Sequence, residues 1–293
     1  MSTRAKKPLA NEPRNPRRRR FLRRALIGGG AVVGGGALWS LFGERTWLTA
    51  RQVSIPIREL PPVLDGFTIA HLSDLHRGPY IGEGQVREAA DMAMSYAPDL
   101  IALTGDHLSL SARYAKSCAD ALSGLRAEYG VFGVLGNHEY WTHRVDRVIT
   151  AYRDAGITML INDSVPVVVG DTIWWLCGVD DIWEGEVDLE KTLAKVPEEH
   201  FRILLCHEPD YADTAAEHDI PLQLSGHSHG GQIRLPWVGP VRLPVYAFKY
   251  PYGLQHVPDS GTQVYTTAGV GVTFPPIRIN CRPEVSILRL ARA

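Results

Sequence analysis

From residue 53 onward the chain alternates short apolar runs with longer mixed segments. We predict β-strands at Val53–Ile57, Phe67–Leu72, Leu100–Leu103, Val131–Leu135, Ile173–Leu176, Ile203–Cys206, Pro221–Leu224, Gln263–Thr267 and Val285–Leu290. Several are apolar at nearly every position, which is typical of strands buried on both faces. Helices are predicted at Gly84–Tyr96, Ser111–Glu128, Arg144–Ala155 and Leu189–Lys195, the first with Val86, Ala89, Ala90, Ala93 and Met94 along one face. Strands alternating with helices indicate an α/β architecture.

The N-terminal region has a different pattern. Residues 1–24 are basic, and residues 1–16 are rich in Pro, Arg, Asn and Lys, which predicts disorder. The apolar stretch Ala25–Phe42 has 18 residues, including six glycines, and lies near the lower limit for spanning a bilayer. We therefore divide the chain into a disordered basic region (1–24), a hydrophobic signal or anchor segment (25–44) and one folded domain (45–293).

The basic region followed by a short apolar segment is the layout of a signal sequence. Arg18–Arg23 resembles the twin-arginine export motif, which makes the twin-arginine export machinery an expected partner. The alternative is an ordinary signal anchor whose arginines obey the positive-inside rule. Residues 37–50 contain no clean Ala-x-Ala site, so cleavage and retention both stay open. We expect the body outside the cytoplasmic membrane, either held there by the N-terminal segment or exported after cleavage.

The net charge of −1 hides an asymmetry. Residues 1–24 hold ten Lys/Arg and one acid, which leaves 21 basic and 31 acidic side chains for the rest. Such an acidic body argues against nucleic-acid binding. The body is long enough for one large core. Its four cysteines are scattered without a C-x-x-C pair, which argues against a zinc ribbon or a redox dithiol.

Polar residues with metal-binding or acid–base chemistry follow five of the predicted strands. They are Asp74 and His76; Asp106; Asn137, His138 and Glu139; His207; and His227 and His229. Each motif alone is weak, because Gly-Asp is usually a turn, Asp-x-His often caps a helix, and a single histidine in an apolar run often belongs to the core. Together they indicate one site, since ligands of open α/β sheets bind outside the carboxyl ends of the strands.

These motifs resemble those of the calcineurin-like metallophosphoesterase superfamily. The matching elements are Asp74-x-His76, Gly105-Asp106, Gly136-Asn137-His138-Glu139, His207 and Gly226-His227-x-His229. The segments GHSHGGQIRLP and PPIRINCRPE are similar to a bacterial branch of signal-bearing, membrane-associated or exported phosphohydrolases, and extend the resemblance to about residue 290. The resemblance implies a four-layer α/β/β/α sandwich of two mixed sheets with helices outside.

The resemblance also implies a role for each residue. Asp74, His76 and His229 would hold one divalent metal ion, Asn137, His207 and His227 a second, and Asp106 would bridge them. Carboxylate, imidazole and amide ligands suit Mn, Fe or Zn. His138 would protonate the leaving oxygen or stabilise phosphoryl charge. Glu139 would either orient that imidazole or serve as a carboxylate at a helix N-terminus, and both alternatives stay open.

The leading hypothesis is therefore a binuclear-metal phosphohydrolase, acting on a phosphodiester or phosphomonoester of the cell envelope with a metal-bridging hydroxide. The alternative is a catalytically silent metal-binding scaffold with the same fold, although every motif residue is intact. Neighbouring residues are less telling: we expect His107 at the surface, and for Trp141 and Trp183 we favour apolar packing over a place on the rim of the site.

Overall fold

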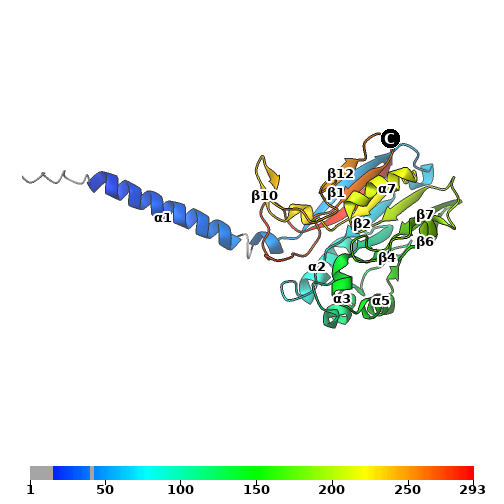
Figure 1. The fold of residues 1–293 in the computed structure, drawn as a ribbon, viewed down its shortest axis with the longest axis horizontal. Helices are drawn as coiled ribbons and strands as arrows, with labels where there is room; N and C mark the ends of the chain where they lie inside the picture. The colour runs from blue at the N-terminus through cyan, green and yellow to red at the C-terminus, as the bar shows by residue number, and fades with distance from the viewer. Residues whose placement is uncertain (1–15, 40–42) are drawn as a thin grey trace, which may run out of the picture.

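The computed structural model describes residues 16–39 and 43–293. Its body consists of two six-stranded sheets packed face to face with helices on the outer faces (Figure 1). This arrangement confirms the predicted α/β/β/α sandwich.

The first sheet has the strand order β1-β14-β2-β3-β4-β5. β14 is antiparallel to β2, and the other neighbouring pairs are parallel. Its strands are β1 (Thr49–Ile57), β2 (Thr68–Leu72), β3 (Leu100–Thr104), β4 (Val131–Val134), β5 (Thr158–Met159) and β14 (Glu284–Arg292). All but the two-residue edge strand β5 were predicted.

The second sheet has the order β12-β13-β9-β8-β7-β6, with antiparallel pairs at both edges and parallel pairs between them. Its strands are β6 (Asp163–Val169), β7 (Thr172–Gly178), β8 (Arg202–Leu205), β9 (Leu222–Ser225), β12 (Gly253–His256) and β13 (Gln263–Thr266). The prediction missed the two edge strands. β6 carries Pro166, a residue that sheets accept at an edge, where its missing N–H costs no ladder bond.

The unbroken apolar runs are explained by burial on both faces of each sheet. In β3, Leu100 and Ala102 point into the core between the sheets, whereas Ile101 and Leu103 pack against the outer helices. β8 alternates in the same way on the other sheet. This two-residue period is a property of extended strands. The central strands are thus fixed by packing on both sides, and their carboxyl ends are held rigidly.

Helices α2, α3 and α5 cover the first sheet, while α6 and α7 cover the second. The α-helices of the body are α2 (Glu83–Met94), α3 (Ala115–Leu122), α4 (Asn137–Trp141), α5 (Val145–Asp154), α6 (Leu189–Leu193) and α7 (Ala212–Glu217). Single 3₁₀ turns are η2 (Glu44–Thr46), η3 (Pro62–Leu64), η4 (Ala112–Tyr114), η5 (Pro209–Tyr211) and η6 (His229–Gly231). The predicted helix over 111–128 is shorter than expected, ending at Leu122 before Ser123-Gly124, and the short helices α4 and α7 were missed.

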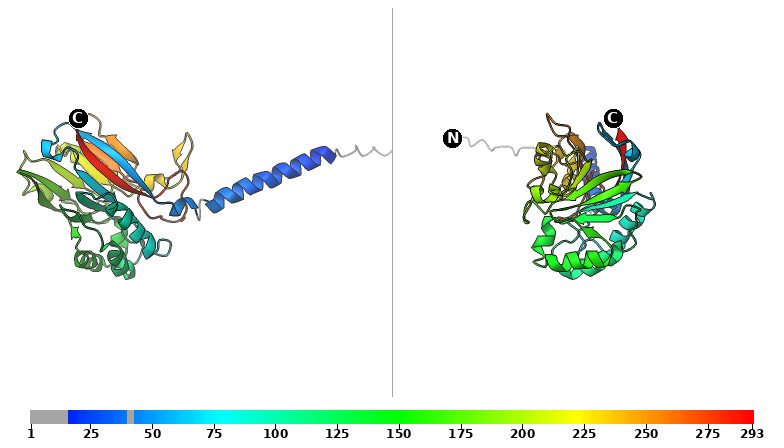
Figure 2. Two further views of the ribbon diagram at one scale, coloured as in Figure 1. Left: turned by 180° about the vertical axis from the view of Figure 1, so that it is seen from behind. Right: turned by 90° about the vertical axis from the view of Figure 1, so that its right-hand side faces the viewer.

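Two features project from the body on one side. Helix α1 (Pro16–Leu38) includes the arginine run and most of the apolar segment, so it runs through the predicted boundary at residue 24. The other feature is a small hairpin of β10 (Arg234–Leu235) and β11 (Gly239–Pro240), on the side of the body nearer to α1 (Figures 1 and 2). Within residues 16–39 and 43–293, no helix combines the length and apolar character needed to cross a membrane. Of the region 1–24 that was predicted to be disordered, residues 16–24 form the start of helix α1, and residues 1–15 lie outside the described residues. Residues 40–42, at the end of the apolar segment, also lie outside them.

Candidate metal centre

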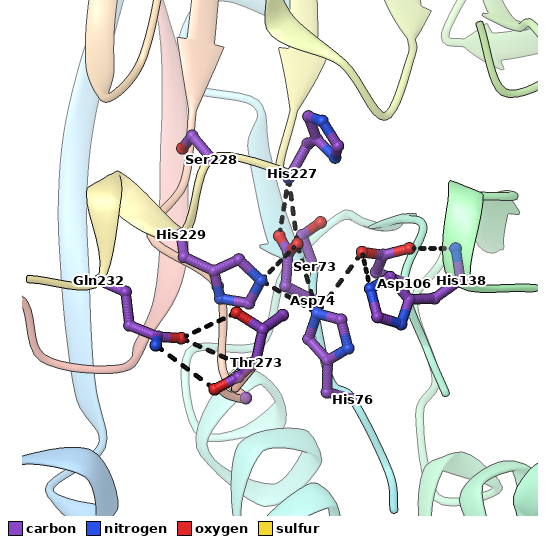
Figure 3. Close-up of polar contacts among 12 residues, drawn as sticks. Ser73, Asp74, His76, Asp106, His138, His227, Ser228, His229, Gln232 and Thr273 are labelled. Carbon is purple, nitrogen blue, oxygen red and sulfur yellow. Dashed lines mark hydrogen bonds and ion pairs between the residues drawn. The ribbon is translucent and has the colours of Figure 1, made fainter. Parts of the chain in front are cut away.

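The carboxyl ends of strands from both sheets meet at one place. Loops after β2, β3 and β4 come from the first sheet, and loops after β8 and β9 from the second. All seven side chains predicted to bind metal are buried there: Asp74, His76, Asp106, Asn137, His207, His227 and His229. Figure 3 labels five of them, the two aspartates Asp74 and Asp106 and the histidines His76, His227 and His229.

The backbone at this site is unusual. Asp74, His76, Asp106, His227 and His229 all have φ between 46° and 66°, in the left-handed region. Such conformations are uncommon for residues other than glycine and cost on the order of 1–3 kcal/mol each. They persist because the strands on either side are packed on both faces. The strain turns each side chain inward immediately after its strand ends.

One group of side chains gathers around Asp74. The Nε2 atom of His229 lies 3.3 Å from Oδ1 of Asp74, and Nε2 of His76 lies 3.4 Å from Oδ2 of Asp106. The two Nε2 atoms are 2.9 Å apart. Asp74, His76, Asp106 and His229 each direct one ligand atom to a common region, all within 4.8 Å of one another. This cluster can hold one cation.

A second group shares Asp106 with the first. Asp106, His207 and His227 also direct one ligand atom each to within 4.8 Å of one another. The ring of His207 is fixed by the hydrogen bond of Nδ1 to the carbonyl of Thr104 at 2.6 Å, and that of His227 by the bond of Nε2 to the carbonyl of Val245 at 2.8 Å. Each bond is made by the ring nitrogen farther from Asp106 and leaves the other nitrogen facing the centre, which is how metal-binding histidines are usually oriented.

The donor atoms at the centre fit a divalent metal. The Oδ1 atom of Asn137 is buried and has no hydrogen-bond partner among the described residues, and Nε2 of His207 faces Oδ2 of Asp106 at 3.3 Å. A buried polar atom without a partner is costly. Cations would satisfy these atoms, and a mixed set of carboxylate, imidazole and amide ligands suits a first-row transition metal.

Burial and mutual charge control protonation at the centre. Burial lowers the pKa of His76 and of His229 well below the ordinary value and that of His227 to about 3, which keeps these imidazoles in the neutral, metal-binding form. Burial raises the pKa of Asp74 to about 6. Burial also disfavours ionisation of Asp106, but His207 and His138 outweigh it and hold its pKa well below the usual range. Asp106 is therefore ionised, which suits a carboxylate that belongs to both groups.

Glycines allow the loops to approach this closely. A Cβ atom on Gly136 would lie 2.5 Å from Oδ1 of Asp106, and one on Gly226 would lie 1.9 Å from the hydroxyl oxygen of Ser73. Gly105 adds a φ of 82° immediately before Asp106. These three positions therefore have no space for a side chain.

The two residues predicted to be catalytic lie in different environments. The backbone N–H of His138 donates to Oδ1 of Asp106 at 2.9 Å, and its ring Nδ1 is hydrogen-bonded to the carbonyl of Ser109. Its other ring nitrogen, Nε2, lies 3.9 Å from Oδ2 of Asp106. His138 is thus at the site, held by a backbone carbonyl.

Glu139 does not orient the imidazole of His138. Its carboxylate accepts hydrogen bonds from the backbone N–H groups of Asp106, Leu108 and Gly136, at 2.9–3.0 Å. Burial, together with the charge of Asp106, raises its pKa to about 8. The alternative of a carboxylate at the N-terminus of helix α4 is the one that the geometry supports. Glu139 is a positioning residue that joins the loops after β3 and β4. The other alternative, that it orients the imidazole of His138, has no contact to support it.

Several further residues of the site were missed or misplaced by the sequence patterns. His107, expected at the surface, is fully buried, with Nε2 hydrogen-bonded to the carbonyl of Val134 at 3.1 Å. Trp141 and Trp183 contact each other and also the site, with ring centroids 4.4 Å from His138 for Trp141 and 5.9 Å from His227 for Trp183. The two tryptophans thus form a wall beside the centre.

Arg278 is the least expected of these residues. Its guanidinium is fully buried and donates to the carbonyls of Ala268, Gly269, Gly271 and Cys281. The loop that it holds packs against Asp74, because the N–H of Gly271 donates to the Asp74 carbonyl at 2.6 Å. Arg278 therefore fixes the loop that packs against the backbone of Asp74, and so supports the candidate metal centre indirectly. Nothing in the segment PPIRINCRPE distinguished Arg278 from Arg282, so no sequence signal indicated this role.

Comparison with known proteins identifies the family. The family model described as calcineurin-like phosphoesterase matches residues 67–231, more than half of the chain and the whole of the centre. The chain belongs to the calcineurin-like phosphoesterase family. It is therefore a metal-dependent phosphoric ester hydrolase, and the cluster of buried Asp and His side chains is its candidate metal centre.

Several relatives resemble the chain over most of its length. It is 31% identical over 286 residues to the metallophosphoesterase YkuE of Bacillus subtilis, a match that covers 93% of this chain and 97% of YkuE. It is 32% identical over 229 residues to the phosphodiesterase YaeI of Escherichia coli, covering 76% of this chain and 82% of YaeI. A Danio rerio protein named transmembrane protein with metallophosphoesterase domain is 32% identical over 256 residues, covering 82% of this chain and 57% of that protein.

Proposed function

We propose that this calcineurin-like phosphoesterase is a binuclear enzyme that hydrolyses a phosphodiester or phosphomonoester of the cell envelope. The observation that supports it best is the division of the buried ligands into two groups that share Asp106. Asp74, His76 and His229 would hold one ion, and Asn137, His207 and His227 the other. Mn, Fe and Zn all fit this donor set. A bound pair of such ions supplies positive charge for the phosphoryl oxygens and a water acidic enough to attack near neutral pH.

The side chains of the protein account for the remaining steps. Because Nδ1 of His138 is held by the carbonyl of Ser109, the protonated imidazole presents its second N–H, on Nε2, toward the centre. That proton can pass to the leaving oxygen, as in general acid catalysis. Glu139 fixes the loops that carry Asp106 and Asn137, and so holds the ligands at a constant separation. Trp141 and Trp183, which lie beside His138 and His227, would contact the group esterified to the phosphate.

The envelope location rests on the N-terminal segment. Helix α1 carries Arg17, Arg20, Arg23 and Arg24 ahead of apolar residues, and Arg18–Arg23 resembles a twin-arginine signal. We propose that the export machinery recognises this segment, and that the body acts outside the cytoplasmic membrane, either attached through the segment or released after cleavage. The word transmembrane in the name of the Danio rerio relative agrees with a membrane location.

The test compares two substitutions of aspartate by asparagine. D106N removes the shared charge at the centre, whereas D163N alters an exposed carboxylate paired with Lys195. We expect the wild type and D163N to bind about two ions and to cleave bis(p-nitrophenyl) phosphate or p-nitrophenyl phosphate. D106N should bind less metal, and its turnover should fall by more than about 100-fold. This exceeds the usual effect of changing a residue that only hydrogen-bonds to a metal ligand. Elemental analysis measures the bound metal, and the release of nitrophenolate measures turnover.

Two results would contradict the proposal. Full turnover by D106N would exclude a shared carboxylate. Two bound ions in the wild type without hydrolysis across a broad panel of phosphoesters would favour the alternative, a silent metal-binding scaffold.

A further inference from the structure

The hairpin of β10 and β11 exposes apolar side chains that nothing in the described chain covers. Trp237 at its tip is fully exposed, and Val238 and Val241 are also exposed. Phe274, in a neighbouring loop, is 81% exposed. We call Trp237, Val238, Val241 and Phe274 the hairpin face. Exposed apolar clusters of this kind usually mark a surface that binds something.

The hairpin and the loop that carries Phe274 form one continuous surface. Ile233 forms a β-bridge with Ile279, and the N–H of Arg234 donates to the carbonyl of Ile279 at 2.9 Å. The side-chain amide of Asn280 donates to the carbonyl of Arg234 at 3.2 Å. The hairpin is therefore fastened to the body, and its apolar tip is held outward.

The N-terminal segment joins the body beside this surface. Glu44 accepts a hydrogen bond from the N–H of Cys281 at 2.9 Å, and the guanidinium of Arg282 lies 3.8 Å from the ring centroid of Trp47. In Figure 1 and in the left view of Figure 2, the hairpin lies on the side of the body toward α1. The chain that carries α1 therefore enters the body close to the hairpin face.

The hairpin differs in charge from the rest of the body. Residues 25–293 carry 21 basic and 31 acidic side chains, yet residues 231–248 contain two bases, Arg234 and Arg242, and no acid. Both Arg242, on the hairpin, and Arg282 are exposed. Exposed bases beside an apolar tip, on an otherwise acidic body, fit an anionic partner.

We infer that the hairpin face docks on an anionic lipid bilayer, with Trp237 and Phe274 entering the interface and Arg242 and Arg282 meeting the headgroups. Tryptophan favours this interface because one end of its ring system is apolar and the other can stay hydrated. Basic residues near an anionic leaflet add attraction. Bilayer contact through the body goes beyond the proposed function, which brings only the N-terminal segment to the membrane.

The docking surface also adjoins the metal centre. Turn η6 begins at His229, and the hairpin follows directly from it through Gln232 and Ile233. Gln232 contacts the Phe274 loop, because its side-chain oxygen accepts from the N–H of Thr273 at 2.9 Å (Figure 3). A docked hairpin would hold the centre near the headgroup layer, where phosphoesters are abundant.

The experiment places a reporter on the hairpin of the full chain. The four native cysteines are buried, so W237C can be labelled selectively with a nitrobenzoxadiazole fluorophore. V168C, on the exposed side of edge strand β6 and away from the hairpin, is the matched control. Vesicles of phosphatidylglycerol and phosphatidylcholine are compared with pure phosphatidylcholine. We expect a blue shift and gain in emission at position 237 with the anionic vesicles, and no change at position 168.

Other outcomes overturn the inference. Cosedimentation with vesicles without a change at position 237 would mean that the N-terminal segment binds alone. Equal changes at both positions would mean unspecific adsorption, and a shift at position 237 that follows protein concentration without lipid would mean that a second copy covers the face. Hydrolysis of a soluble nitrophenyl ester without vesicles tests the proposed function separately, since neither labelled position lies at the centre.

Discussion

Replacing Gly226 by alanine tests whether the geometry of the centre, beyond the identity of its ligands, determines activity. A Cβ atom at this position would lie 1.9 Å from the hydroxyl oxygen of Ser73 and 2.3 Å from Oδ2 of Asp74, against 3.4 Å or more in ordinary contact. The loops must therefore separate by more than 1 Å. Ser73 cannot turn away freely, because its hydroxyl donates to the carbonyl of Thr104 at 2.7 Å.

The two consequences differ in size. Misplacing a reacting group by about 1 Å can lower the rate about 100-fold. Overpacking a buried site costs about 1–3 kcal/mol, and each kcal/mol shifts the Tm of a domain of this size by about 2–4 °C. We therefore expect kcat/KM of G226A to fall about 100-fold, whereas its Tm falls by roughly 10 °C or less.

The assay measures kcat/KM on a soluble aryl phosphodiester with excess Mn, together with Tm and bound metal. G124A is the matched control, because a Cβ atom on Gly124 meets nothing within 4 Å and the residue is exposed. If G226A keeps the activity and metal content of G124A, the loops after β2 and β9 adapt without cost. The argument that the glycine sets the ligand geometry would then be refuted.

Two further predictions concern the buried Arg278 and the twin-arginine export motif. R278M leaves several buried carbonyls without donors and should lower the free energy of unfolding by roughly 3 kcal/mol or more. R278K should be intermediate, because lysine keeps the charge but lacks the planar fork of donors. An unchanged melting curve for R278M would contradict the idea that Arg278 supports the loop behind Asp74. Lysine at both Arg18 and Arg19 should block translocation through the twin-arginine route, as measured by cell fractionation, and unchanged translocation would leave only the ordinary anchor.

The pattern of apolar runs predicts the central strands well, because burial on both faces demands apolar residues at every position. β3 and β8 are examples, and the polar residues after them fall in the candidate centre. Edge strands β6 and β12 escaped prediction, since one side of an edge strand contacts solvent and tolerates polar residues and proline. Short helices such as α4 have too few residues to show a period.

The support around the centre could not be predicted for a different reason. Arg278 binds backbone carbonyls, and any sequence supplies these, so no spacing marks their place. Glu139 likewise bonds to backbone amides across two loops, and its sequence position between His138 and Tyr140 suggested a ring partner as readily. Trp141, at the end of α4, meets Trp183, in the loop after β7, only because segments that follow strands of different sheets converge. Such contacts depend on the tertiary fold alone.

The division of the ligands between the two sheets has a consequence for biogenesis. Asp74, His76, Asp106 and Asn137 follow strands of the first sheet, whereas His207, His227 and His229 follow strands of the second. Neither sheet alone therefore carries a complete group of candidate ligands. Because His229 and strand β14, which lies between β1 and β2 of the first sheet, come late in the chain, we expect tight metal binding to arise only after the C-terminal part has folded.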